Sequence, residues 1–196
     1  MTMRKRLTAL FLTGLLLLAA GCARQAADTA PAAEEGFAEN AEALYDFGTV
    51  QIGLPVEYLD LLIVETGGDD CEEDRPLHPR DLMQVYEKAS VEAAEADYGE
   101  GAGFGFLWGF WELDQAALEE LLDTDPSGIS VFARKGDLYY AFLFPTDVQF
   151  YRSGDFSAVT EQDWQHWEAL NELGNQVRED FMVRNELTLY SAQGIS

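Results

Sequence analysis

The chain has 196 residues, of which 47% are hydrophobic and 12% aromatic, and its formal net charge is −24 at pH 7. This apolar content is enough for one domain with a core of roughly 150 residues. The charge argues against nucleic-acid binding, in which Lys and Arg neutralise phosphates, and against a domain that lies flat on anionic lipid. Such a surface is either simply solvated or attracts cations and basic partners.

The first segment has the pattern of an export signal. Three basic residues at 4–6 precede an apolar run from Leu7 to Ala20. A helix needs roughly 20 apolar residues to cross a bilayer, and this run is shorter. We therefore expect a signal peptide instead of a permanent membrane span.

The end of this run, Leu-Ala-Ala-Gly-Cys at 18–22, resembles the lipobox of bacterial lipoproteins. The resemblance implies cleavage before Cys22, a diacylglycerol on its sulfur, and a domain anchored on the extracytoplasmic face of the cell membrane. Two acyl chains are enough for stable anchoring. The alternative is an ordinary secretory signal followed by a chance cysteine. Because the signal removes basic residues only, the mature charge would be about −27. We expect no cofactor besides this covalent lipid.

The pattern predicts three parts: a signal peptide at 1–21, an acidic Ala/Glu-rich tether at 22–43 and a single domain at 44–196. Within the first half of the domain, alternation and apolar runs predict several elements. These are strands at 49–52, 61–64 and 82–86, an acidic loop at 67–80, a helix at 91–98 with Ser90 as its N-cap, and a strand at 104–111.

The strand at 104–111 is the clearest in the chain. Strict alternation would place Phe104, Phe106, Trp108 and Phe110 on one face, with Trp108 in the core. The preceding segment 99–105 is rich in glycine, but it fits no dinucleotide-binding register. It predicts a turn, with close helix packing over Gly105 and Gly109.

Capping residues define the second half of the domain. Asp114 is a suitable N-cap for a helix to Leu122, and Thr160 with Asp163 forms a capping box that opens a further helix. Gly174 is expected to interrupt that helix. The remaining expected elements are a hairpin of strands at 129–133 and 138–144, a short strand at 148–151 and an edge strand at 187–190.

The strands at 104–111 and 138–144 are apolar on both faces, which is typical of a covered sheet. We therefore expect an α+β fold in which helices cover both faces of a mostly antiparallel sheet, an α/β/α sandwich. The order of elements faintly resembles PsbP/Mog1-type sandwiches. The segments 85–90, 136–140 and 145–148 resemble uncharacterised surface lipoproteins of Gram-positive-type bacteria, a family with no assigned activity.

Asp123, Asp125 and Ser127 after a helix resemble the first half of an EF-hand loop. The twelfth position, which should be a bidentate Glu, is Arg134. The segment therefore predicts a turn and no metal site, with a Ca²⁺-stabilised module as an alternative. The acidic run 69–74 around Cys71 is interpreted as a solvated loop, and its carboxylates disfavour a reactive thiolate.

The sequence contains no specific catalytic motif. His78 and His166 are the only histidines, and no nucleophile elbow accompanies them. The aromatic residues Trp111 and Tyr139 fall opposite the main aromatic stripes, so they are the candidates for a ligand-stacking surface. We expect a non-enzymatic binding or interaction module for a protein, peptide or glycan. The alternative is a cell-envelope hydrolase.

Overall fold

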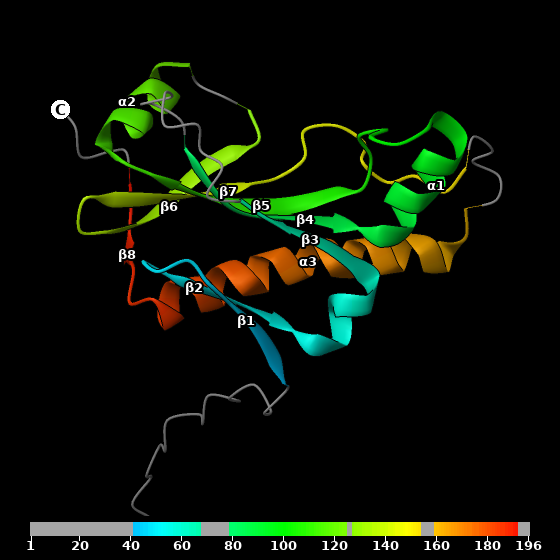
Figure 1. Cartoon of the computed structure of the whole chain (residues 1–196), viewed down its shortest axis with the longest axis horizontal. Coiled ribbons are helices and arrows are strands. Elements are labelled where there is room, and N and C mark those ends of the chain that lie inside the picture. Colours follow the sequence, from blue (N-terminus) through cyan, green and yellow to red (C-terminus); the bar gives the residue numbers. More distant parts are fainter. Residues whose placement is uncertain (1–40, 68–78, 125–126, 154–158, 192–196) are drawn as a thin grey trace, which may run out of the picture. The chain divides into compact units, whose positions relative to one another are not determined.

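The structure, a computed structural model of the chain, describes residues 41–67, 79–124, 127–153 and 159–191 (Figure 1). All of these belong to one compact unit, residues 39–196. Cys22, the acidic run 69–74 with Cys71, His78 and Asp125 lie outside the described residues. Among the helices that are described, none is long and apolar enough to cross a membrane.

Eight strands, three α-helices and one 3₁₀ helix make up the described part of the chain. In order they are β1 (Glu42–Asp46), β2 (Gln51–Pro55), the 3₁₀ helix η1 (Val56–Leu61), β3 (Leu62–Thr66), β4 (Arg80–Glu87), α1 (Lys88–Tyr98), β5 (Phe106–Leu113), α2 (Gln115–Thr124), β6 (Ile129–Lys135), β7 (Leu138–Leu143), α3 (Glu161–Arg184) and β8 (Thr188–Leu189).

The strands form two antiparallel sheets. β1 and β2 pair with each other, and the other six strands form one sheet in the order β3-β4-β5-β7-β6-β8. This confirms the expected α+β class with an antiparallel sheet. The hairpin of β6 and β7 and the edge position of β8 agree with the sequence prediction.

The face of the large sheet that packs against α3 is here called the inner face, and it carries the main core. Trp108 and Phe110 of β5 and Phe142 of β7 pack there against Phe181 and its neighbours on α3. Trp108 is 1% exposed, as predicted, and its Nε1 donates a hydrogen bond to the Leu170 carbonyl oxygen at 3.3 Å.

The helix α3 runs without a break through Gly174, so the expected interruption is wrong. A Cβ at position 174 would lie 2.7 Å from the Trp108 indole Cγ, which is too close for any real contact. The glycine therefore admits the buried indole against the helix backbone. Tertiary packing outweighs the roughly 1 kcal/mol that a helical glycine costs relative to alanine.

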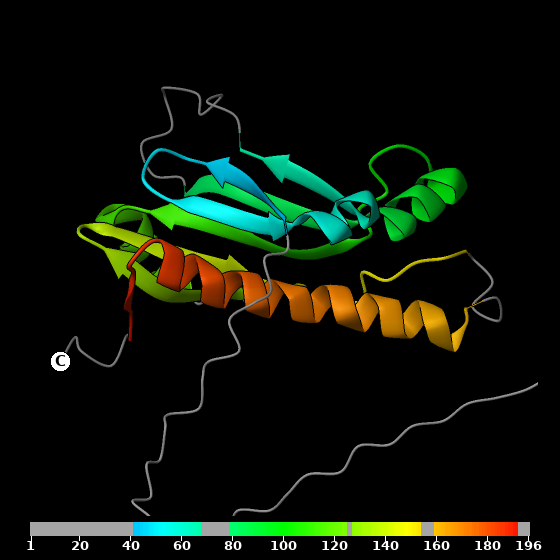
Figure 2. The same ribbon diagram turned by 90° about the horizontal axis from the view of Figure 1, so that it is seen from below.

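The β1–β2 hairpin lies beside α3 on the same inner face (Figures 1 and 2). Asn185, just after α3, bonds the backbone of Gln51 twice: its Oδ1 accepts from the N–H and its Nδ2 donates to the carbonyl, both at 2.8 Å. Arg184 adds an ion pair to Glu42 at 2.6 Å. The start of β1 lies within 22–43, the segment that the sequence analysis assigned to the tether. The sequence pattern missed it because this segment has few apolar residues and its partners are distant in the chain.

The opposite, outer face is only partly covered by helices. α2 contacts β5 and β7, where Leu113, Ala117 and Ala141 form a second small core. Figure 1 shows α2 and α3 on opposite sides of the sheet, with α1 at the end of β4. The helices do not clearly cover both faces, so the structure shows the coarser α+β class with an antiparallel sheet.

Two of the three predicted helix N-caps are present in the structure. Asp114 accepts a hydrogen bond from the Ala117 N–H at 2.8 Å, and Thr160 and Asp163 form the predicted capping box. Ser90 is not an N-cap, because α1 begins at Lys88 and the Ser90 hydroxyl bonds Glu87 instead. The expected strand at 148–151 is irregular backbone, with its aromatic side chains packed against α1 and α3.

Candidate functional site

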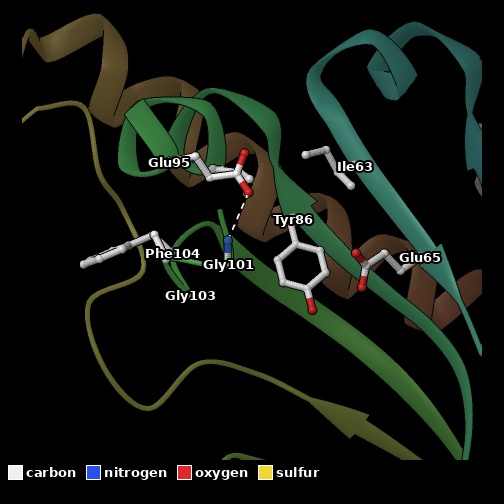
Figure 3. A pocket seen from close by; sticks show the side chains of 9 residues that line it. Ile63, Glu65, Tyr86, Glu95, Gly101, Gly103 and Phe104 are labelled. Carbon is white, nitrogen blue, oxygen red and sulfur yellow. Dashed lines mark hydrogen bonds between the residues drawn. The ribbon is translucent and has the colours of Figure 1, made fainter. Parts of the chain in front are cut away.

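A cavity of about 340 Å³ opens on the outer face, where β3 and β4 meet α1 (Figure 3). Among the described residues that line it, none is Lys, Arg or His. We call it the acidic pocket, and its lining residues are Ile63, Glu65, Tyr86, Val91, Glu95, Gly101, Ala102, Gly103 and Phe104.

A β-bulge places an aromatic ring next to the pocket. Val85 pairs with Trp108 but the next residue, Tyr86, pairs with Phe106, so Leu107 is an extra residue in β5. Because of this bulge, Phe106 shares the outer face with Tyr86, and the two rings meet edge to face at 5.6 Å. The prediction that Phe106 lies on the same face as Trp108 is therefore wrong.

The glycine-rich segment forms one wall of the pocket. Gly101, Gly103 and Gly105 all have positive φ, between +76° and +90°. A Cβ on Gly105 would lie 2.7 Å from the Val91 Cγ2, so this glycine lets the segment cross closely over α1. The expected helix packing is confirmed at Gly105. At Gly109 a Cβ would instead meet the carbonyl of Met83 on β4.

Two carboxylates stand at the rim of the pocket. Figure 3 shows Glu65 and Glu95 on opposite sides of the Tyr86 ring. The Glu95 carboxylate accepts a hydrogen bond from the Gly101 N–H at 3.4 Å, whereas the Glu65 carboxylate forms no hydrogen bond or ion pair with any described residue. Glu65 and Glu95 are both exposed to solvent. Within the described part of the chain, no basic side chain pairs with either carboxylate, and the pocket presents negative charge.

Tyr86 forms the floor between these carboxylates. Its hydroxyl donates a hydrogen bond to the Gln84 Oε1 at 2.7 Å. Burial raises the pKa of Tyr86, and the negative charges of Glu65 and Asp81 raise it further. The phenol therefore stays neutral near pH 7 and presents its ring, not a nucleophilic phenolate, to the cavity.

Aromatic side chains continue beyond the pocket. Phe104 packs against Tyr151 with ring centroids 4.9 Å apart and stacks on Tyr98 at 6.2 Å. Tyr98 is 65% exposed, more than any other aromatic side chain among those described. The surface beside the acidic pocket is therefore aromatic as well as acidic.

A buried ionic cluster lies on the inner side of β4, directly behind the pocket. Arg152 holds the Glu87 carboxylate with two hydrogen bonds, at 2.6 and 2.9 Å, and pairs with Asp163 at 3.0 Å. Ser90 donates to Glu87 and accepts from the Tyr151 N–H. Ser90 is 0% exposed, so no substrate reaches its hydroxyl. We interpret this cluster as a structural link between α1, the 145–153 segment and α3.

The residues that the sequence selected lie elsewhere. Trp111 and Tyr139 are half-buried beside α2, and their polar groups bond Asp81 and Gln115. Among the described residues, the more exposed aromatic side chains are those of Tyr98, Phe144 and Trp164. His166 is exposed on α3 and does not line the acidic pocket.

Asp123 and Ser127 are exposed residues on either side of the segment 125–126, which is not described. Within the described ranges, no group of three or more His, Cys, Asp or Glu side chains could hold a metal ion.

Sequence reasoning missed Glu65, Tyr86 and Glu95. They come from a strand, the next strand and a helix, and no local motif connects them. Comparison with protein-family models, curated proteins and solved structures finds no match to this chain. The resemblance to Gram-positive-type lipoproteins therefore stays a prediction.

Proposed function

We propose that the protein is a lipid-anchored, extracytoplasmic binding module, with the acidic pocket as its ligand site. The lipobox pattern at 18–22 supports the anchor. The pocket supports binding, because it combines two carboxylates that have no ion-pair partner among the described residues with aromatic rings at the surface. This combination, in Glu65 and Tyr86 above all, is the observation on which the binding role rests. The ligand is a protein, peptide or glycan.

Binding fits the pocket better than hydrolysis. Among the described lining residues there is no Ser, Cys or His, and the hydroxyl of Tyr86 is already engaged with Gln84. The two carboxylates are the one feature that favours a second candidate, a glycoside hydrolase of the cell envelope. Such an enzyme needs one carboxylic acid kept protonated by an apolar environment, whereas Glu65 and Glu95 are both exposed. If Glu95→Gln abolished release of reducing ends from envelope polysaccharide, the hydrolase would replace the binding module.

The anchor is tested by fractionation of cells that express the wild type or Cys22→Ala. We expect the wild type in the membrane fraction and the variant as an unprocessed or released form with altered mobility. A variant that stays in the membrane fraction with unchanged mobility would refute the lipid anchor.

The pocket is tested with Ala102→Trp, which places a large side chain in its lining. Full-length protein in mild detergent is screened by ligand-observed NMR against amino acids, short peptides and neutral saccharides. We expect hits that Ala102→Trp abolishes and that the matched exposed variant Ala169→Trp on α3 leaves intact. Hits that are equally insensitive to both variants, or an absence of hits, would refute the pocket as the ligand site.

We also propose that the domain is a PsbP/Mog1-like α/β/α sandwich. Support comes from α3 on the inner face and from the contacts of α2 with β5 and β7 on the outer face. A crystal structure that left most of the outer face uncovered would contradict this description.

A further inference from the structure

We propose that the acidic pocket binds the ammonium group of a lysine side chain, presented by an extended peptide that lies along β3. This inference rests on the binding function proposed above and specifies its ligand.

Charge is the first argument for a cation. Two carboxylates border a small cavity with no basic residue among its described lining, and the Glu65 carboxylate has no hydrogen-bond or ion-pair partner among the described residues. Two negative charges that border one cavity favour the entry of a positive group between them. The net charge of −24 adds a long-range attraction for basic partners.

The aromatic floor is the second argument. Figure 3 shows the Tyr86 ring between the two glutamates. Because its hydroxyl is tied to Gln84 and its pKa is raised, the ring keeps its neutral π-system. A lysine ammonium over the ring gains a cation–π contact together with the two ion pairs, while its methylene stem contacts Ile63 and Val91.

The position of β3 argues for a peptide as the source of the cation. β3 is an edge strand of the large sheet: one of its edges pairs with β4, and no described strand pairs with the other edge. Edge strands bind extended peptides by backbone hydrogen bonds, and every second side chain then points to the same face. Ile63 and Glu65 are the β3 residues that line the pocket. A peptide strand beside them would direct alternate side chains towards the cavity, whose volume of about 340 Å³ exceeds that of one ammonium group.

The test uses full-length protein in mild detergent and four probes. They are an acetylated and amidated Ala-Lys-Ala tripeptide, the same tripeptide with norleucine in place of lysine, choline, and a neutral trisaccharide. Dissociation constants and backbone amide shifts are measured by NMR. We expect the lysine tripeptide to bind most tightly and to shift Gly101, Gly103 and Tyr86.

Variants distinguish binding in the pocket from non-specific electrostatic attraction to an acidic protein. Glu65→Gln with Glu95→Gln should weaken the lysine tripeptide by about fivefold or more, whereas the charge-matched pair Glu120→Gln with Glu168→Gln should change it much less. Tyr86→Phe keeps the ring and should retain binding, and Tyr86→Leu should lose part of it.

Equal weakening by both glutamate pairs would overturn the proposal, since it would show attraction without a site. Tighter binding of norleucine or of the trisaccharide, abolished by Ala102→Trp, would refute the cation but keep the pocket as a ligand site. Choline binding as tight as the lysine tripeptide would refute the peptide. If Ala102→Trp affects no probe, the proposed function itself fails.

Discussion

Tyr86 and Glu87 are neighbours at the end of β4, yet they face opposite sides of the sheet. On the inner side, Glu87 is 1% exposed and Arg152 satisfies both of its carboxylate oxygens. On the outer side, Tyr86 lies beside Glu65, which has no such partner within the described chain. The carboxylate group thus has two different roles on the two faces of the sheet. A carboxylate that is buried and paired holds segments together, whereas one left open at a pocket is available to a ligand.

The energetic consequences of the two environments differ. Removing one partner of a buried ion pair leaves an uncompensated charge and costs about 3–5 kcal/mol. A charge at an exposed position contributes roughly 0–1 kcal/mol. Substitution of Glu87 should therefore change folding stability, and substitution of Glu65 should change binding alone.

The largest effect is expected in the inner core. Trp108→Ala should lower the free energy of unfolding by about 3–5 kcal/mol, because it removes a fully buried indole and leaves a cavity beside Gly174. Trp111→Ala, on the outer face, is the matched control and should cost clearly less, since Trp111 is only half-buried. Denaturant unfolding of both variants measures the difference. Equal losses would show that the two faces are packed alike.

The next effect is expected in the ionic cluster. Arg152→Gln should cost about 3 kcal/mol or more, because Glu87 stays buried without its cation. Arg184→Gln is the control: its partners Glu42 and Asp180 are 36% and 40% exposed, so we expect a loss of about 1 kcal/mol or less. Adding Glu87→Gln to Arg152→Gln should give less than the sum of the two single effects. Similar losses for the two arginines would contradict a structural role for the cluster.

Acid sensitivity offers a smaller and more specific effect. The pKa of Asp163 is lowered from 3.8 to about 2, first by hydrogen bonds from the Thr160 hydroxyl and backbone N–H and then by Arg152. Since the folded state favours the carboxylate, this stabilisation is present above pH 3.8 and is lost as the pH falls towards 2.

Asp163→Asn should therefore lower stability at neutral pH and flatten its decline over that acidic window. Glu161→Gln, in the same helical turn, removes the same charge and should keep the wild-type decline. Unfolding by denaturant across the pH range compares the three proteins. Parallel curves for wild type and Asp163→Asn would exclude the contribution of this cap.

The smallest effect is expected for calcium. With Arg134 where an EF-hand needs Glu, the 123–128 segment should bind Ca²⁺ weakly or not at all. Thermal melts in chelator and in millimolar Ca²⁺ at constant ionic strength should differ little, and Mg²⁺ should give the same shift. A shift of many degrees that is specific to Ca²⁺ and abolished by Asp125→Ala would support the Ca²⁺-stabilised module instead.

The features that the sequence predicts well are those set by neighbouring residues. Asp114 and the Thr160–Asp163 box cap the helices as expected, and the turn between β6 and β7 forms the expected hairpin. These signals depend on residues within three or four positions of one another. They require no knowledge of the rest of the fold.

The features that the sequence misses depend on distant contacts. β1 is stable as a strand because it pairs with β2 and Arg184 reaches Glu42 from the end of α3. Gly174 stays helical because Trp108 fills the space beside it, and the bulge at Leu107 reverses the face of Phe106. The acidic pocket combines residues from three elements, so its composition becomes visible only in the folded chain.

The most direct test of this account compares Glu87→Gln with Glu65→Gln in the full-length protein, by denaturant unfolding under identical conditions. Each change removes one negative charge, and the two residues lie on the paired strands β3 and β4. We predict a loss of about 3 kcal/mol for Glu87→Gln and a change within about 0.5 kcal/mol for Glu65→Gln. Equal losses, or a larger loss for Glu65→Gln, would contradict the division between a structural inner side and a ligand-binding outer side.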